Sequence, residues 1–409
     1  MRIACVGGGP ASLYFSIVMK GFDPGHDITV HERNPAGSSY GWGVTYWSDL
    51  LDKLRDGDPA TAAAIGAESV RWVDGEAHIR DEVTTHRGDE SFGIGRQRLL
   101  DILAERATEL GVRVEYGSEI ASLDQLPDAD LVVAGDGVNS RLRRQHAEHL
   151  GTEVTNGRNR FIWLGTSRVF DAFTFAFVES EHGWIWFYGY RFQDDRSTCV
   201  VECSPETWAG LGFGTLGEDQ SLALLERIFA RQLDGHPLLM RADGVGSAPW
   251  LSFRTMTNNS WHHDNLVLIG DAAHTTHYSV GAGTTLALED AIGLARALRA
   301  HPEHLPSALA AYQQERKAAI LSTQSAARYS AQWYEDIDRY LRLKPTQLFA
   351  LLGQRHSPLL PHVPPQMYYW VNQAAEEFTA LRKFRKWLGP RVVRTLHARE
   401  AAQSGPNRV

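Results

Sequence analysis

Glycines near the start of the chain have the spacing of a turn that binds a nucleotide. Gly7 and Gly9 directly follow the short apolar stretch 2–6, and Ser12 stands where such turns often carry a third glycine. A glycine at the first position permits a tight turn, and one at the second lets the backbone approach a pyrophosphate at a helix N-terminus. We therefore expect a dinucleotide to bind here, in preference to a glycine-rich turn without a ligand.

An acidic residue completes this pattern. Glu32 ends a second predicted strand at 27–32, twenty residues after Ser12. A carboxylate in this position can accept hydrogen bonds from the ribose of an adenosine. The residues that we expect to contact the cofactor in this part of the chain are Gly7, Gly9, Pro10, Ala11, Ser12, Glu32 and Arg33.

A second match to the glycine pattern occurs at Gly212, Gly214 and Gly217. No apolar strand precedes it, so it lacks the context that makes such a pattern a nucleotide site. We predict a loop that leads into a helix from Gln220, and no second nucleotide-binding domain.

Three later motifs resemble those of the class A FAD-dependent aromatic monooxygenases. They are Arg96-x-x-Leu99, the segment 130–141 around Asp136, and Gly270-Asp271 with the glycine loop 281–284. The resemblance implies that Arg96 lies near the FAD phosphates, that Asp136 serves both FAD and transient NAD(P)H docking, and that Asp271 binds the ribityl chain. Helix amides after the glycine loop would stabilise negative charge on the reduced flavin. The FAD-binding residues implied by these motifs are Arg96, Asp136, Asp271, Gly281, Ala282, Gly283 and Thr284.

Further stretches are similar to one branch of that family. They are 41–44, 161–166, 261–279 and 326–335, so the resemblance extends to about residue 350. The branch contains salicylyl-CoA 5-hydroxylase, the flavin domain of 2-aminobenzoyl-CoA monooxygenase and the tryptophan-derived hydroxylase of violacein biosynthesis.

The chain departs from the aryl-CoA members of this branch at three places. Thr285 stands where those members tend to carry lysine, and Tyr188-Gly189-Tyr190 stands where they have His-Ala-Tyr. The tail beyond about Pro364 has no counterpart. These departures concern the substrate rather than the flavin.

The resemblance implies hydroxylation of an aromatic ring. NADH or NADPH reduces FAD, O2 is captured as a C4a-hydroperoxide, and one oxygen passes to an electron-rich carbon of a phenolic, aminobenzoyl or indolic substrate. That substrate is either a CoA or carrier-protein thioester such as salicylyl-CoA, or a free aromatic or indole intermediate. The choice between NADH and NADPH is left open.

The resemblance and the residue types also indicate candidates for catalysis. His277 titrates near neutrality and could assist deprotonation or contact the flavin, although simple packing in its loop is an equal alternative. Tyr188, Tyr190 and Trp186 are candidates for the cavity floor, with ordinary sheet packing as the alternative. The predicted catalytic residues are His277, Tyr188 and Tyr190, and the predicted substrate-binding residues are Val44, Trp186, Tyr278 and Thr285.

The elements that must position these residues indicate an α/β fold. Stretches 161–170, 173–178, 183–190 and 197–203 are rich in aromatic and β-branched residues and predict an antiparallel sheet. The chain then returns to the nucleotide-binding part with a buried strand at 267–269. We predict a discontinuous Rossmann-type FAD-binding domain, a β-rich substrate domain and a helical C-terminal region, with the bounds 1–155 plus 250–300, 156–249 and 301–409.

Composition excludes several other functions. The net charge of −8 argues against nucleic-acid binding, and three cysteines without a Cys/His cluster indicate no metal site. We expect a cytoplasmic protein without a secretory signal or membrane span, and a homodimer is left open.

One segment runs against the overall charge. Residues 382–399 hold seven basic residues and no acidic one. They form either a solvated helix face or a docking patch for CoA phosphates or an acidic carrier domain.

Two other functional classes remain as alternatives. One is a flavin oxidase or dehydrogenase. The other is a binding protein without flavin, like the prenyl-GTPase dissociation inhibitors, against which the intact Asp136 and Asp271 motifs argue.

Overall fold

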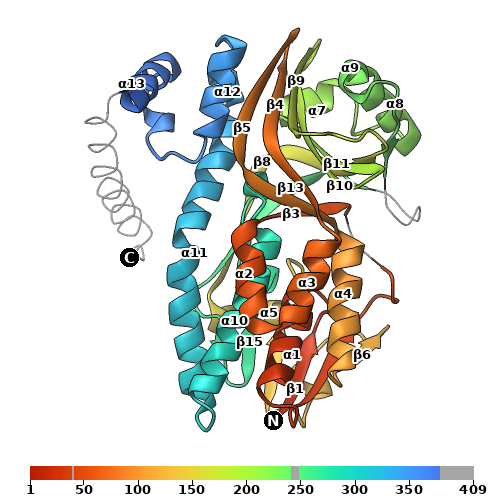
Figure 1. Cartoon of the computed structure of the whole chain (residues 1–409), viewed down its shortest axis with the longest axis vertical. Coiled ribbons are helices and arrows are strands. Elements are labelled where there is room, and N and C mark those ends of the chain that lie inside the picture. The colour runs from red at the N-terminus through yellow and green to blue at the C-terminus, as the bar shows by residue number, and fades with distance from the viewer. Residues whose placement is uncertain (39–40, 241–247, 378–409) are drawn as a thin grey trace. The chain divides into compact units, whose positions relative to one another are not determined.

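The computed structural model describes residues 1–38, 41–240 and 248–377. The chain divides into two compact units, Met1–Ala327 and Arg328–Val409. Figure 1 shows the elements of both. Each unit is described by itself.

The nucleotide-binding part of the first unit is a six-stranded sheet. Its strands follow the order β14-β15-β7-β1-β2-β6, and all neighbours are parallel except β14 and β15. The strands are β1 (Arg2–Val6), β2 (Asp27–Glu32), β6 (Arg113–Tyr116), β7 (Leu131–Ala134), β14 (His262–His263) and β15 (Leu266–Leu268). The predicted return of the chain to this sheet after a β-rich insertion is therefore confirmed.

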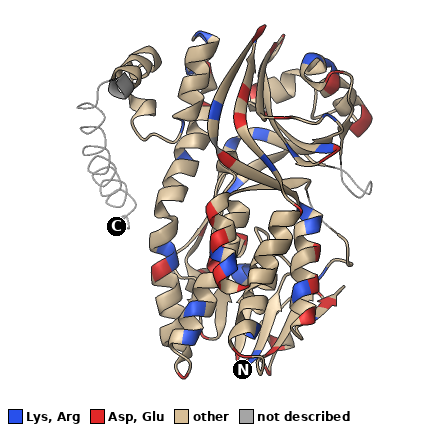
Figure 2. Ribbon diagram, viewed as in Figure 1, with Lys and Arg blue, Asp and Glu red and all other residues tan. Residues whose placement is uncertain are grey.

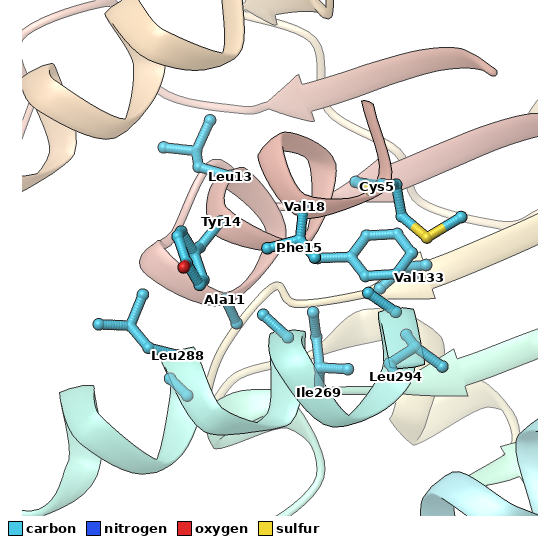
Figure 3. Packing of buried hydrophobic residues seen from close by; sticks show 14 of the residues in the cluster. Cys5, Ala11, Leu13, Tyr14, Phe15, Val18, Val133, Ile269, Leu288 and Leu294 are labelled. Atoms are coloured by element: carbon cyan, nitrogen blue, oxygen red, sulfur yellow. The ribbon is translucent and has the colours of Figure 1, made fainter. Parts of the chain in front are cut away.

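Two helices pack on this sheet and on each other. Helices α1 (Pro10–Phe22) and α10 (Gly283–Ala300) meet through buried apolar side chains. In Figure 3 Phe15 of α1 lies between the strand residue Cys5 and Leu294 of α10. Burial of such side chains stabilises the fold by about 1.5–3 kcal/mol each, so both helices hold their N-terminal ends firmly at the edge of the sheet.

Further helices complete this part. They are α2 (Ser48–Gly57), α3 (Pro59–Ala67), α4 (Arg96–Glu109), α5 (Arg141–Gln145) and α6 (Ala147–Leu150), with the 3-10 turns Leu123–Gln125, Gly270–Ala272 and Tyr278–Val280.

The second sheet of this unit has nine strands. The order is β12-β8-β11-β10-β9-β4-β5-β3, with β13 also paired to β8, and only β4 and β9 are parallel among these neighbours. The strands are β3 (Gly43–Trp47), β4 (Val70–Ile79), β5 (Glu82–Gly95), β8 (Thr152–Thr166), β9 (Phe173–Ser180), β10 (Gly183–Gln193), β11 (Arg196–Cys203), β12 (Leu238–Leu239) and β13 (Leu251–Asn258). The sheet thus takes up strands from 43–95, outside the predicted bounds 156–249, and those domain bounds stay a prediction.

Alternation along β10 gives this sheet two distinct faces. Ile185 and Phe187 belong to a hydrophobic core on one face, which also contains Phe229. The helices that contribute side chains to this core are α7 (Pro205–Gly210), α8 (Glu218–Ile228) and α9 (Ala230–Leu233). Tyr188 and Tyr190 belong to a second cluster on the opposite face. The loop predicted at 212–217 does connect α7 to α8.

The second unit is helical. It contains the end of α11 (Leu305–Glu335), then Ile337–Arg339, α12 (Pro345–Gly353), Leu360–His362 and α13 (Pro365–Glu377). Trp333 stacks on Tyr340, with ring centroids 4.8 Å apart. The basic segment 382–399 lies outside the described residues. Among the helices that are described, none is long and apolar enough to cross a membrane.

Candidate flavin and substrate site

The first glycine turn has the geometry that its sequence predicts. Gly7 has a φ of +98°, and a Cβ there would lie 2.6 Å from the carbonyl oxygen of Gly135. Its amide donates to the carbonyl of His31 at 2.8 Å. Only glycine fits this position, because both the backbone conformation and the space exclude a side chain.

The helix that follows begins with open amides. Gly9 caps α1 in an extended conformation, Pro10 is the first helical residue, and no side chain caps the amides. Such an end favours an anion. Ser12 is fully buried, and a Cβ at Gly135 would lie 2.2 Å from its Oγ. A glycine on the neighbouring loop therefore makes room for the serine that replaces the third glycine of the turn.

Glu32 has a partner within the protein. Its Oε2 accepts from the amide of Gly8 at 2.7 Å, and its Oε1 accepts from the amide of Asn34 at 2.8 Å. The carboxylate thus braces the glycine turn. Its predicted contact with a ribose stays a prediction, as does that of the exposed Arg33.

Asp271 and Arg96 approach each other from different motifs. Protein around the Asp271 carboxyl raises its pKa, and His274 and Arg96 oppose this shift. Asp271 is nevertheless exposed to solvent, a combination that indicates a side chain in a depression. Burial lowers the pKa of Arg96, while the charge of Asp271 raises it.

A buried arginine joins the two flavin loops. Arg143 is 2% exposed and donates to the carbonyls of Val138 at 2.7 Å and Ala272 at 3.1 Å. Burial lowers its pKa to about 10. Arg141, the last residue of the motif segment 130–141, instead donates its amide to Asp136 at 2.9 Å. Arg143 lies three residues after Ser140, whose side chain caps the helix Arg141–Gln145. This spacing from a helix cap is the feature of the sequence that could have indicated Arg143.

A second buried network lies under the loop of Asp271. The Oδ2 of Asp290 accepts from the amide of Gly270 at 3.0 Å and lies 2.8 Å from His274 Nε2, while its Oδ1 accepts from Arg316 at 2.8 Å. Burial alone would raise the pKa of Asp290, but His274 and Arg316 hold it below its usual value. The sequence around Arg316 does not indicate this role, because Arg316 lies on α11, 26 residues from Asp290 along the chain.

The glycine loop at the start of α10 meets strand β3. Gly281 has a φ of +63°, and a Cβ there would lie 2.7 Å from Thr45 Oγ1. Ala282 caps the helix, and Gly283, Thr284 and Thr285 form its first turn. The Thr285 side chain is buried.

These motifs fit FAD. In the part of the chain that the structure describes, the buried polar atoms of these motifs without a hydrogen-bond partner include Arg96 Nε, Asp136 Oδ1 and Thr285 Oγ1. A cation, a carboxylate and a hydroxyl, together with open helix amides, suit a ligand with phosphates and several hydroxyl groups.

Aromatic rings cover the adjoining face of the nine-stranded sheet. Tyr188 lies 5.7 Å from Phe173 and 6.2 Å from Tyr278 between ring centroids, and Tyr278 lies 4.5 Å from Phe161. Val44 is buried on β3. The structure thus brings predicted residues of the sheet and of the loop after Asp271 into contact.

His277 and Tyr190 have defined partners. The Nδ1 of His277 lies 2.8 Å from Ser279 Oγ, and its ring meets the edge of Phe253 at 4.9 Å. The hydroxyl of Tyr190 donates to the carbonyl of Gly43 at 2.8 Å, and burial raises its pKa. Trp186, two residues before Tyr188, packs on Phe177. The catalytic and substrate roles of these residues stay predictions.

The chain is similar to known proteins over most of its length. The family described as an FAD binding domain matches residues 125–326. A salicyloyl-CoA 5-hydroxylase from a Streptomyces species is 34% identical over 84% of this chain and 67% of its own length. A 3-hydroxy-4-methyl-anthranilyl-[aryl-carrier protein] 5-monooxygenase from Streptosporangium sibiricum is 34% identical over 82% of this chain and 89% of its own length.

The chain is also similar to a more distant relative in sequence and to a solved structure in fold. Protodeoxyviolaceinate monooxygenase from Chromobacterium violaceum is 29% identical over 88% of this chain and 96% of its own. The crystal structure of 2-methyl-3-hydroxypyridine-5-carboxylic acid oxygenase superposes with a TM-score of 0.69 at 18% identity, over 87% of this chain and 96% of that one. It has the same fold.

Proposed function

Because the chain belongs to the family of FAD-dependent aromatic monooxygenases that includes these hydroxylases, we propose that it hydroxylates an aromatic acyl group presented as a thioester. The enzyme uses FAD, NAD(P)H and O2. Two relatives at 34% identity are named for substrates held on CoA or on an aryl-carrier protein, and this observation carries the proposal.

The flavin motifs would hold FAD through groups of this chain. The amides at the start of α1 and Arg96 are suited to the phosphates, and Asp271 to the ribityl hydroxyls. When bound, FAD would accept a hydride from NAD(P)H and react in its reduced form with O2. Arg143 bonds to the carbonyls of Val138 and Ala272 and so joins the two loops, and Asp290 holds the second loop through the amide of Gly270.

The aromatic face would orient the ring and exclude water. Tyr188, Tyr278 and Val44 offer apolar surface that can stack on a planar substrate. Water exclusion matters because it prevents loss of the activated oxygen.

His277 would act as a hydrogen-bond donor. Its Nδ1 accepts from the amide of Ser279, so a neutral ring carries its proton on Nε2. At that atom the ring donates a hydrogen bond to a carbonyl or phenolic oxygen of the substrate. Replacing His277 with glutamine, which retains a donor, should preserve more activity than replacing it with leucine.

A free aromatic or indole substrate is the second candidate. Thr285 and Tyr188-Gly189-Tyr190 depart from the pattern of the aryl-CoA members, and the relative from Chromobacterium is named for a substrate that is no thioester. We also propose a cytoplasmic location, since three buried free cysteines fit a reducing compartment. A homodimer stays a prediction, to be measured by sedimentation.

A substrate screen tests this function. NAD(P)H oxidation is measured with free aromatics and with the same acyl groups as pantetheine and CoA thioesters, and product masses are recorded. We expect slow oxidation alone and a sharp rise with one thioester, with a gain of one oxygen. Oxygen insertion only into a free aromatic would support the second candidate, and equal oxidation with every compound would contradict both.

A further inference from the structure

Two hydroxyl groups on neighbouring strands hold the backbone of a third strand. The Tyr190 hydroxyl donates to the carbonyl of Gly43 at 2.8 Å, and the amide of Gly43 donates to Thr198 Oγ1 at 2.9 Å. Both contacts are buried, and they join residues 147 and 155 positions apart. We call the two side chains, together with the backbone of Gly43, the hydroxyl clamp.

The register of the strands explains why the two hydroxyls act together. Tyr190 on β10 lies opposite Thr198 on β11, and the two side chains also hydrogen bond to each other. The groups can therefore form a closed ring. In this ring the Gly43 amide donates to Thr198, the Thr198 hydroxyl donates to Tyr190, and the Tyr190 hydroxyl donates to the Gly43 carbonyl. Each bond of such a ring polarises and strengthens the next.

Gly43 offers its backbone because of its place in the sheet. It lies on β3, the last strand in the order, and opposite Gly95 of β5. A strand at the end of a sheet leaves the N–H and C=O groups on its outer side without a partner strand. A Cβ at Gly43 would lie 2.5 Å from the Cβ of Phe192, so only glycine lets β3 approach β10 this closely.

The clamped strand contacts two parts of the FAD site. The carbonyl of Trp42, directly before Gly43, accepts from the amide of Arg96 at 2.8 Å. Two residues after Gly43, Thr45 lies against Gly281, where a Cβ would come within 2.7 Å of the Thr45 Oγ1. Arg96 and the glycine loop would both hold FAD. A displacement of β3 would therefore disturb both.

The other side of the clamp belongs to the aromatic face. The ring of Tyr190 stacks on Phe173 at 5.5 Å and on Trp72 at 5.9 Å between centroids. Phe173 in turn stacks on Tyr188 at 5.7 Å. Tyr190 thereby joins the aromatic face to the strand that contacts the FAD site.

The clamp contains no charged group. Tyr190, Thr198 and the residues of β3 are of uncharged types, and β3 is tan in Figure 2. The helices α2 and α4, which follow β3 and β5 in the chain, carry charges of both signs in the same view. Because salt screens interactions between charges, it should leave the contribution of the clamp unchanged.

We propose that Tyr190 and Thr198 are positioning residues, which hold β3 against the FAD site through the backbone of Gly43. The inference rests on the proposed function for the place of FAD, but not for the substrate. A tyrosine hydroxyl has one proton to donate, and that of Tyr190 is given to a buried carbonyl. Burial raises its pKa, so the hydroxyl keeps this proton at neutral pH. Tyr190 therefore acts through β3, in place of the catalytic role predicted from the sequence.

The test measures FAD binding without any substrate. The apoprotein is titrated with FAD, and the Kd is obtained from the change in flavin fluorescence. Tyr190→Phe removes one hydroxyl but keeps the ring, and Thr198→Val removes the other and keeps a β-branched side chain. Each variant should raise the Kd of FAD about five- to tenfold, the effect expected when one hydrogen bond is lost.

The double variant distinguishes a clamp from two independent contacts. Because both hydroxyls hold the same residue, loss of the second should raise the Kd less than about twofold beyond the effect of the first. Independent contacts would multiply, to about 25–100-fold in total, and would contradict the clamp. The ratio of variant to wild-type Kd should be the same at low and at high salt.

Tyr14→Phe is the matched control. The hydroxyl of Tyr14 is also buried and donates to a backbone carbonyl, that of Leu54, at 2.8 Å. The melting temperature of the apoprotein should fall by a similar amount in Tyr14→Phe and in Tyr190→Phe. Only the variant at position 190 should raise the Kd of FAD.

Three results distinguish the possible roles of Tyr190. An unchanged Kd of FAD in Tyr190→Phe, or an equal rise in Tyr14→Phe, would overturn the proposal and leave the clamp a purely structural contact. A normal Kd with a strong loss of kcat in Tyr190→Phe would restore the predicted catalytic role. If the FAD results hold but no aromatic compound is hydroxylated, the proposed function fails and the positioning role stands.

Discussion

Around the flavin motifs, buried charges and backbone groups are joined by hydrogen bonds, whereas on the adjoining sheet face aromatic rings pack against one another. A single carboxylate, that of Asp290, contacts Gly270, His274 and Arg316. On the sheet face, Tyr188 packs against the rings of Phe173, Phe175 and Tyr278.

This difference indicates which part of the enzyme can accept amino-acid substitutions among related proteins. Hydrogen bonds to buried charges are directional, and removal of one partner leaves the other buried and uncompensated. Ring packing tolerates exchange of one apolar side chain for another of similar volume. A family with this construction can keep one flavin site while its members act on different aromatic substrates, as the names of the relatives indicate.

The largest effect is expected from breaking the buried network. Arg316→Ala leaves the fully buried Asp290 without the guanidinium that bonds its Oδ1 and should lower the free energy of unfolding by about 3–5 kcal/mol, measured with urea. Arg296→Ala is the matched control, because its pair with Glu315 is exposed and is worth less than about 1 kcal/mol. Equal losses in both variants would show that the network does not hold the flavin end.

A smaller effect, on FAD binding, should follow from removing the carboxylate of Asp271. Asp271→Ala should weaken FAD binding about 10–100-fold, since a hydrogen bond to a charged group contributes about 1.5–3 kcal/mol. Free and bound FAD are separated by filtration of the purified protein. The exposed Asp128→Ala should retain FAD fully. Stoichiometric FAD and unchanged reduction in the Asp271 variant would contradict the assignment.

On the aromatic side the expected effect is smaller again. Tyr188→Leu removes ring contacts with Phe173 and Tyr278, each worth about 0.5–1.5 kcal/mol, and should raise the substrate KM with little change in FAD content. Tyr188→Phe keeps the ring and should behave like the wild type. A strong loss of kcat in the phenylalanine variant would instead support the catalytic role predicted for the hydroxyl.

The smallest effect is expected from mild acid. His274 and Arg316 hold the pKa of Asp290 below its ordinary value of 3.8, against the effect of burial. A depressed pKa contributes stability above the ordinary value, and this stability is lost as the pH falls through the pKa of the folded state. The advantage of the wild type over Asp290→Asn in urea should therefore persist from pH 7 to 5 and shrink only below about pH 4. A decline between pH 7 and 5 would refute the depressed pKa.

Features that depend on local backbone geometry were predictable from the sequence. The glycine turn, the strand that ends at Glu32 and the loop with Asp271 are readable because a few adjacent residues specify a turn, a helix start and a strand end. The antiparallel strands from 161 to 203 were readable from their aromatic and β-branched residues. The FAD cofactor and the monooxygenase family followed from those motifs in their order.

Contacts between distant segments of the chain could be identified in the folded structure alone. Strands β4 and β5 carry charges and glycines that hide their pattern, and pairing of β4 with β9 places them in the nine-stranded sheet. Arg143 and Arg316 reach backbone or carboxylate partners on other elements, and Tyr190 reaches the carbonyl of Gly43 across 147 residues. Such contacts leave no local signal, because the residues that make them are neighbours only after the chain has folded.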